Sequence, residues 1–269
     1  MRSMISALVA AAMAILIADS SPITPTIGKE MNTQQTNENV SEEFHQTYTL
    51  AAGGRVSVRN VVGPVRITAW DRDEVRVDAV KRAPSQEILA EAQIKVDARP
   101  DIIEIETKYP INSNNKPASV EYTINVPRTA RLERVEIVTG ELEIDNVAGV
   151  VSASNTNGQI IARGLSSEAR LSTVNGRLEA SFADLNRAQA ILLKSVNGQI
   201  TLRLPGNANA DLKAQSMRGR IKNDFGLTAN RGDLSGTSLA GVIGQGGARI
   251  TLDNMNGGIS ILRSNGTAP

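Results

Sequence analysis

The chain has 269 residues, of which 41% are hydrophobic, and such a chain can bury the core of one large β domain or two small ones. Its 29 Lys and Arg residues nearly balance 28 Asp and Glu residues, so no strong overall charge attracts it to nucleic acid. The absence of cysteine excludes thiolate catalysis, zinc–thiolate sites, disulfides and a lipid-modified N-terminal cysteine. A single histidine, His45, and an aromatic content of 3% argue against most enzymes.

The N-terminal segment has the order of a secretory signal peptide. Arg2 precedes an apolar run over residues 5–18, and the chain turns polar at Asp19. The run is shorter than the roughly 20 residues that a membrane-spanning helix needs, and it lacks the amphipathic period of a core helix. We therefore predict a signal peptide over residues 1–20, cleaved near Ser20 or after Ala18, and export to the periplasm or the cell surface.

The next segment, residues 21–40, is rich in Thr, Asn, Gln and Pro. It carries too little apolar surface to offset the entropy of ordering. We expect a flexible tether that lets the following domain stand clear of a membrane or wall.

The body of the chain contains an internal repeat, in which a small or amide residue and a glycine precede an alternating segment. The glycines of the copies are Gly140, Gly158, Gly176, Gly198, Gly219 and Gly257. Subtraction of neighbouring glycine numbers gives intervals of 18, 18, 22, 21 and 38, the last being close to two periods. A period of about 20 residues is typical of a solenoid or a meander.

Alignment of the copies on their glycine separates inward from outward positions. The position five residues before the glycine is apolar: Val135, Ala153, Leu171, Leu193, Ala214 and Leu252. The position two residues after it is also apolar: Leu142, Ile160, Leu178, Ile200, Ile221 and Ile259. Each copy is therefore predicted to form a strand, a glycine corner and a second strand, with the corner glycine at positive φ and a preceding Asn that tolerates the same region.

Two architectures fit this pattern. Asn-Gly is a strong hairpin signal, which would give an antiparallel meander. The recurrence of each apolar column once per period instead favours an all-β, single-stranded parallel β-solenoid, in which successive coils stack over residues 131–263 and a tail follows at 264–269. Three residues before the glycine, small polar side chains form a column that either bonds from coil to coil or consists of ordinary turn residues: Asn155, Thr173, Ser195, Ser216 and Asn254.

The region before the repeat, residues 41–130, is rich in strands without the period. Alternating segments predict strands over residues 55–59, 65–70, 75–80 and 103–106. A Ser85 cap and early acidic residues predict a short helix over residues 85–93. We expect an N-terminal β cap that protects the open end of the coils within one continuous domain.

A family resemblance joins these observations. The rungs of the type Asn197-Gly198-Gln199-Ile200, the segment Asn223-Asp224-Phe225-Gly226 and the closing run from Ile243 to Leu252 resemble the bacterial "putative adhesin" family of unknown function. The resemblance covers roughly residues 56–262 and implies a β-solenoid at the cell envelope. It implies no catalytic residue.

The position directly after the glycine is mostly polar and is predicted to face solvent as a row: Glu141, Gln159, Arg177, Gln199 and Arg220. A polymer or partner protein could dock along such a row by many weak contacts. We therefore expect a non-catalytic, adhesin-like binding or scaffold module of the cell envelope. Its partner would be an envelope protein or a polysaccharide, with no cofactor, no metal, no nucleic acid and no membrane-spanning helix after signal cleavage.

Two other functions are compatible with the sequence. Because Glu143 and Glu179 both stand three residues after their glycines and two coils apart, at about 4.8 Å per coil they would lie about 10 Å apart, within the range of a glycosidase pair. A carbohydrate-active enzyme is thus one alternative. The other is a component of an envelope-stress sensor that would signal through a membrane partner.

Overall fold

The computed structural model describes residues 39–110, 117–232 and 236–264. The predicted signal peptide and nearly all of the predicted tether lie outside the described residues. Val40, at the end of the predicted tether, begins the first strand, β1.

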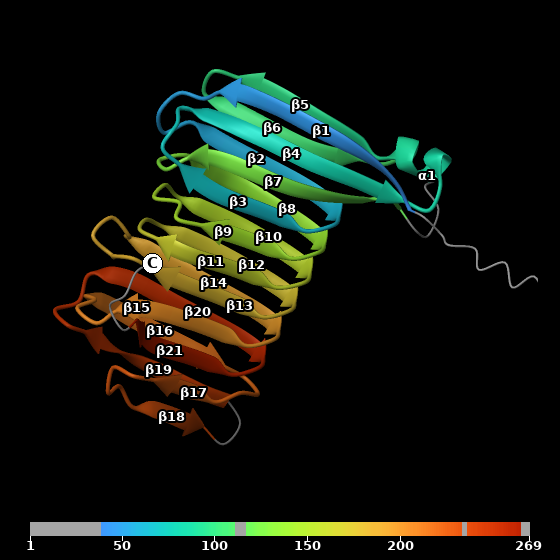
Figure 1. Cartoon of the computed structure of the whole chain (residues 1–269). Helices are drawn as coiled ribbons and strands as arrows, with labels where there is room; N and C mark the ends of the chain where they lie inside the picture. Colours follow the sequence, from blue (N-terminus) through green and yellow to red (C-terminus); the bar gives the residue numbers. More distant parts are fainter. Residues whose placement is uncertain (1–38, 111–116, 233–235, 265–269) are drawn as a thin grey trace, which may run out of the picture. The chain divides into compact units, whose positions relative to one another are not determined.

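Two sheets build the described part of the chain (Figure 1). In the order of their pairing, sheet A contains β1 (Val40–Thr49), β4 (Glu74–Ala83), β7 (Ser119–Pro127), β3 (Val65–Trp70), β9 (Leu142–Asp145), β11 (Ile160–Leu165), β13 (Leu178–Phe182), β15 (Ile200–Pro205), β21 (Ile259–Ser264) and β17 (Ile221–Asn223). Sheet B contains β18 (Ala229–Gly232), β19 (Gly236–Ile243), β16 (Ala210–Ser216), β20 (Ala248–Asn256), β14 (Ala190–Asn197), β12 (Ala169–Asn175), β10 (Val151–Asn157), β8 (Arg131–Thr139), β2 (Arg55–Val62), β6 (Ile102–Lys108) and β5 (Gln93–Arg99).

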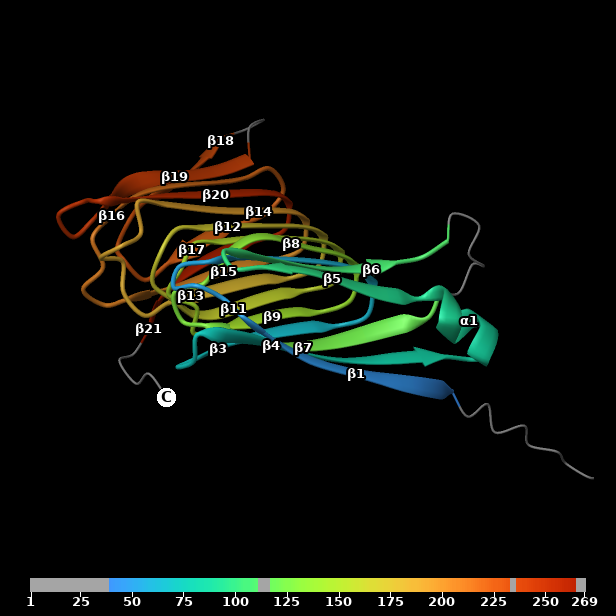
Figure 2. The ribbon, with the colours of Figure 1, turned by 90° about the horizontal axis from the view of Figure 1, so that it is seen from above.

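Each repeat forms one coil, with a strand in sheet B, a glycine corner and a strand in sheet A. The strands pair in parallel with matching positions side by side, so that Leu171 of β12 lies between Ala153 and Leu193. Figure 2 shows the strands of the two sheets as opposite walls of the coils. The predicted parallel β-solenoid is confirmed, and the meander is not formed.

The core lies between the two sheets. Both predicted apolar columns are buried, as Leu171 at 1% exposure and Ile200 at 0% illustrate. Because every coil presents side chains of similar size to its neighbours, adjacent coils cover one another's apolar edges.

The corner glycines are required by close packing between coils. A Cβ atom on Gly176 would overlap the backbone carbonyl of Gly158, and the same overlap recurs at Gly158, Gly198 and Gly257. These glycines have positive φ values, as predicted, for example +155° at Gly176. The preceding asparagines do not share that conformation, since Asn146 is the one non-glycine residue with positive φ in the described ranges.

The coils do not stack in the order of the sequence. β20 pairs with β14 on one side and β16 on the other, and β21 lies likewise between β15 and β17. The coil of β20 and β21, which comes last along the chain, therefore lies in space between the coil of β14 and β15 and the coil of β16 and β17. This corrects the expectation that successive coils stack on one another. The described residues of the long interval between Gly219 and Gly257 form no hidden coil. They include β18 and β19, which pair antiparallel at the end of sheet B.

A further coil lies in the region predicted as a cap. β2 and β3 join at Gly63 and pair in parallel with β8 and β9. Residues 41–130 thus contribute one coil as well as the strands that cover the end: β1, β4, β5, β6 and β7. The helix α1 (Gln86–Glu91) begins after Ser85, whose Oγ accepts a hydrogen bond from the amide of Ile88, and this confirms the predicted cap and helix.

Candidate binding surface

The predicted polar row is continuous over four coils and then interrupted. The register places Glu141, Gln159, Arg177 and Gln199 on adjacent coils. Gly258 follows Gln199, and Arg220 comes only after it, because the last coil is inserted at this point. The five residues therefore do not form the unbroken ladder predicted from the sequence.

Most polar groups of this row bond to one another. Gln159 donates to the carboxylate of Glu141, and Arg177 donates to Oε1 of Gln159 at 2.9 Å. Gln199 donates to the hydroxyl of Ser260 at 3.2 Å. The row is a network between coils that stabilises the corner, and a ligand would have to displace these bonds.

The two carboxylates considered for glycoside cleavage lie two coils apart, as predicted, and each is paired with an arginine. Glu143 and Glu179 both have Ile161 as their register neighbour, so β11 lies between them. Arg66 donates to Glu143 at 2.6 Å, and Nε of Arg177 lies 3.3 Å from Glu179. This environment does not favour the pair as a general acid and a base.

The small polar residues three positions before each glycine, which we call the inner polar column, form hydrogen bonds from coil to coil. Asn155 donates to the carbonyl of Gly140 at 2.8 Å, and Asn254 donates to that of Gly198 at 2.7 Å. Thr173 and Ser216 make the equivalent bonds with their hydroxyl groups. The bonding interpretation of this column is confirmed at these positions.

A second ladder runs along the residue directly before the glycine. Asn175 donates to Asn157 at 2.9 Å, Asn197 donates to Asn175 at 2.8 Å, and Asn256 donates to Asn197 at 2.8 Å. Since these amides link four coils, the corner is fixed on both sides of the glycine.

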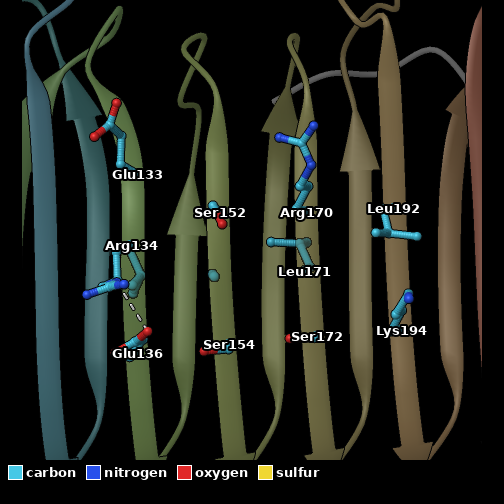
Figure 3. A pocket seen from close by; sticks show the side chains of 12 residues that line it. Glu133, Arg134, Glu136, Ser152, Ser154, Arg170, Leu171, Ser172, Leu192 and Lys194 are labelled. Atoms are coloured by element: carbon cyan, nitrogen blue, oxygen red, sulfur yellow. Dashed lines mark ion pairs between the residues drawn. The ribbon is translucent and has the colours of Figure 1, made fainter.

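Two hollows that could receive a ligand lie on the outer face of sheet B. One has a volume of about 410 Å³ and crosses β8, β10, β12 and β14. Figure 3 shows its short side chains, Ser152, Ser154 and Ser172, between the longer side chains of the flanking strands. We call it the polar hollow. Its lining residues are Glu133, Arg134, Val135, Glu136, Ser152, Ala153, Ser154, Arg170, Leu171, Ser172, Leu192 and Lys194.

The second hollow, of about 530 Å³, adjoins the first and is mainly apolar. Val174, Met255 and Met217 line it and are 41%, 49% and 62% exposed. We call it the apolar groove. Its lining residues are Ser154, Asn155, Thr156, Ser172, Thr173, Val174, Lys194, Ser195, Val196, Gln215, Met217, Asp253, Asn254 and Met255.

The charged side chains at these hollows form exposed and weak ion pairs. Arg134 lies 3.3 Å from Glu136, and Lys194 lies 3.8 Å from Asp253. Arg170 pairs with Glu168 at 3.8 Å. Pairs of this exposure contribute little to stability, so their cations can turn toward an incoming anion at low cost.

The sequence contains a signal for the apolar groove. Strand alternation directs the position two residues before each glycine outward, yet it is mostly apolar: Val61, Val138, Thr156, Val174, Val196, Met255 and Met217 in spatial order. An outward position that stays apolar over several coils indicates a contact surface.

Two kinds of site are absent from the described residues. They contain no group of three or more His, Cys, Asp or Glu side chains placed to hold a metal ion. No helix in the described ranges combines the length and apolar character needed to cross a membrane.

Comparison with models of protein families assigns the chain to a family. A model of the family described as Toastrack DUF4097 matches residues 111–262, more than half of the sequence. The chain belongs to this family. The predicted resemblance to a family of unknown function is thereby confirmed.

Solved structures with a similar course of the chain include two bacterial proteins. One is a putative cell adhesion protein from Clostridium sporogenes, 14% identical, covering 84% of this chain and 100% of its own, with a TM-score of 0.47. Another is a putative adhesin from Bacteroides fragilis, 15% identical, covering 83% of this chain and 97% of its own, with a TM-score of 0.39. Comparison with curated proteins finds no match.

Proposed function

We propose that the protein is an exported, non-catalytic module of the cell envelope that binds a partner, or serves as a scaffold, through the outer face of sheet B. The observation that carries the proposal is the pair of adjoining hollows across the parallel strands of this face. Open hollows on a rigid frame suit recognition of an extended partner.

The frame supports recognition because it keeps the strands in register. The core columns, the inner polar column and the asparagine ladder fix each coil against the next. Side chains at equivalent positions consequently repeat at about 4.8 Å along the solenoid. A linear partner could form many weak contacts whose combined strength gives useful affinity.

Export is the other part of the proposal. It is supported by the order of Arg2, the apolar residues 5–18 and the polar residues that follow. Cleavage near Ser20 would leave residues 21–39 as a tether before β1. The partner would accordingly be an envelope protein or polysaccharide in the periplasm or at the cell surface.

The experiment compares capture of envelope material by two variants and the unchanged protein. Ser154→Gln combined with Ser172→Gln fills the polar hollow with uncharged side chains. Arg177→Glu combined with Arg220→Glu alters the polar row on the other side of the corner. We expect the serine variant to capture at least tenfold less of an intact partner than the unchanged protein does. The arginine variant should capture as much as the unchanged protein.

Two results would contradict the proposal. Equal capture by the serine variant and the unchanged protein would remove sheet B as the binding face, and loss in the arginine variant alone would favour the polar row. Captured glycan with shortened chains would instead favour the enzyme alternative, for which Glu143→Gln and Glu179→Gln are the next variants.

A further inference from the structure

The two hollows on sheet B form one continuous surface with two different chemistries. Ser154, Ser172 and Lys194 line both of them. On one side of these residues the lining carries arginine and glutamate side chains. On the other side it carries valine and methionine, together with polar residues such as Gln215 and Asp253. A ligand that spans the surface must therefore be polar at one end and apolar at the other.

We propose that this surface binds a single-chain anionic amphiphile, with its alkyl chain in the apolar groove and its acidic head group in the polar hollow. This inference rests on the proposed function, because it names the ligand class of the same face. It commits to one alkyl chain taken up as a monomer.

The dimensions of the apolar groove fit one extended chain. Its lining residues come from β10, β12, β14, β20 and β16, which are consecutive in sheet B. Four strand spacings make the groove about 19 Å long. Its volume of about 530 Å³ lies within the range of small-molecule sites.

The lining of the groove favours an alkyl chain over a sugar chain. Sugar rings commonly stack on aromatic side chains, and none of the residues that line either hollow is aromatic. Valine methyl groups and flexible methionine thioethers instead adapt to an alkyl chain. Met217 and Met255, at 62% and 49% exposure, would lose apolar contact with water when the chain binds.

The polar hollow offers complementary groups for an acidic head. Three cations line it, Arg134, Arg170 and Lys194. Each has a carboxylate partner that an acidic head group would replace, namely Glu136, Glu168 and Asp253. Lys194 stands where the two hollows meet, so it can pair with a head group whose chain continues into the groove. The hydroxyl groups of Ser152, Ser154 and Ser172 can donate further hydrogen bonds to the carboxylate oxygens of the head group.

The test titrates the purified full-length chain with hexadecanoate below its micelle concentration and follows heat release. Octanoate tests the need for a long chain, and hexadecyltrimethylammonium tests the need for a negative head. We expect saturable binding of hexadecanoate and at least tenfold weaker binding of both other compounds.

Matched variants locate the site. Val174→Thr with Met255→Gln should weaken hexadecanoate binding at least tenfold. Val242→Thr is the control, because Val242 is 57% exposed on β19 and lines neither hollow. Arg170→Gln with Lys194→Gln should weaken hexadecanoate binding tenfold. Lys213→Gln, which removes an exposed cation of β16 outside the hollows, should leave that binding unchanged.

All of these proteins share the apolar residues 5–18, so a difference between them reports on sheet B. Equal binding by the groove variant and the unchanged protein, or equal binding of the cationic compound, would overturn the inference. Binding to phosphatidylglycerol vesicles but not to monomeric hexadecanoate would also overturn it, in favour of a membrane surface. If envelope capture needs sheet B while hexadecanoate does not bind, the proposed function stands and the amphiphile fails.

Discussion

At a glycine corner, the backbone of one coil occupies the space that a side chain of the next coil would need. At Gly176 the atom nearest to an added Cβ is the carbonyl oxygen of Gly158. Gly158 is the corner residue between the paired strands β10 and β11, so its carbonyl cannot move alone. The glycine is thus required by the approach of two backbones as well as by its φ value.

Gly176→Ala should lower the free energy of unfolding by about 2–4 kcal/mol, because the methyl group forces the two corners apart. Gly206→Ala is the control, since no atom lies within 4 Å of a Cβ at that position. Urea unfolding followed by circular dichroism measures both. An equal effect of the two substitutions would show that the corners are not in contact.

His45 is the residue whose ionisation should affect stability near neutral pH. Nδ1 of His45 lies 2.7 Å from Asp78 and Nε2 lies 3.2 Å from Glu43, while Arg76 also pairs with Asp78. The hydrogen bond to Asp78, followed by that to Glu43, raises the pKa of His45 above 6.5. The protonated ring therefore stabilises the contact of β1 with β4.

Since the pKa is raised in the folded state, this stabilisation is complete below pH 6.5 and disappears as the pH rises through the folded-state pKa. His45→Gln should lower the urea midpoint at a pH of about 5.5 and change it little at about 8.5. The quantity to compare is the difference between variant and unchanged protein at each pH, because other groups titrate in both. A difference independent of pH would contradict this role of the imidazole.

At the scale of single strands, the inner polar column and the asparagine ladder differ in burial. Asn155 is 2% exposed and donates to the corner carbonyl of Gly140, whereas Asn175 lies at the exposed edge of the corner. Loss of a buried bond leaves a carbonyl without a partner, which costs more than loss of a bond that water can replace.

Asn155→Ala should therefore destabilise the protein by about 1–3 kcal/mol, and Asn175→Ala by about 0.5–1 kcal/mol. Asn155→Thr should recover part of the loss, because Thr173 makes the same type of bond in the next coil. Chemical unfolding of the three variants ranks them. A larger effect at Asn175 than at Asn155 would show that the outer ladder is the stronger link.

The strands can be predicted where side chains of one type recur at a fixed distance from a glycine. Leu171 and Ile200 are assigned to the core by their columns, which are apolar in every copy. The coil at Gly63 does not stand out in the sequence, since its corner lacks the Asn-Gly pair and the corner beside it in space, at Gly140, comes much later in the chain. The apolar groove becomes visible only when the outward direction of the column that holds Val174 and Met255 is combined with its composition.

At the scale of the whole molecule, the order of the coils depends on contacts that sequence spacing does not reveal. The interval between Gly219 and Gly257 is equally compatible with a missing coil and with a hairpin. The repeat pattern is the same whether the last coil is added at the end or inserted, because each coil presents the same columns to both neighbours. Only the pairing of β20 with β14 and β16 decides between them.

A chain that ends after Ile243 should lose more than its last coil. β16 and β17 pair with β20 and β21 on their inner side, so removal of residues 244–269 leaves them without that contact. We expect hydrogen exchange of the β16, β17 and β19 amides to become fast, while β8, β10 and β12 stay protected. Protection of β16 in the shortened chain would show that it can pair directly with β14.

The insertion of the last coil also bears on how such a protein can change in length. Both ends are specialised, one by α1 and its neighbouring strands and the other by β18 and β19, whereas the coils from β8 to β15 repeat the same parallel geometry. Duplication of one repeat unit, such as the interval from Gly158 to Gly176, could therefore be accommodated without a new end. Each duplication would extend the outer face of sheet B by about 4.8 Å. Addition of repeats during evolution could therefore match the length of this surface to partners of different length.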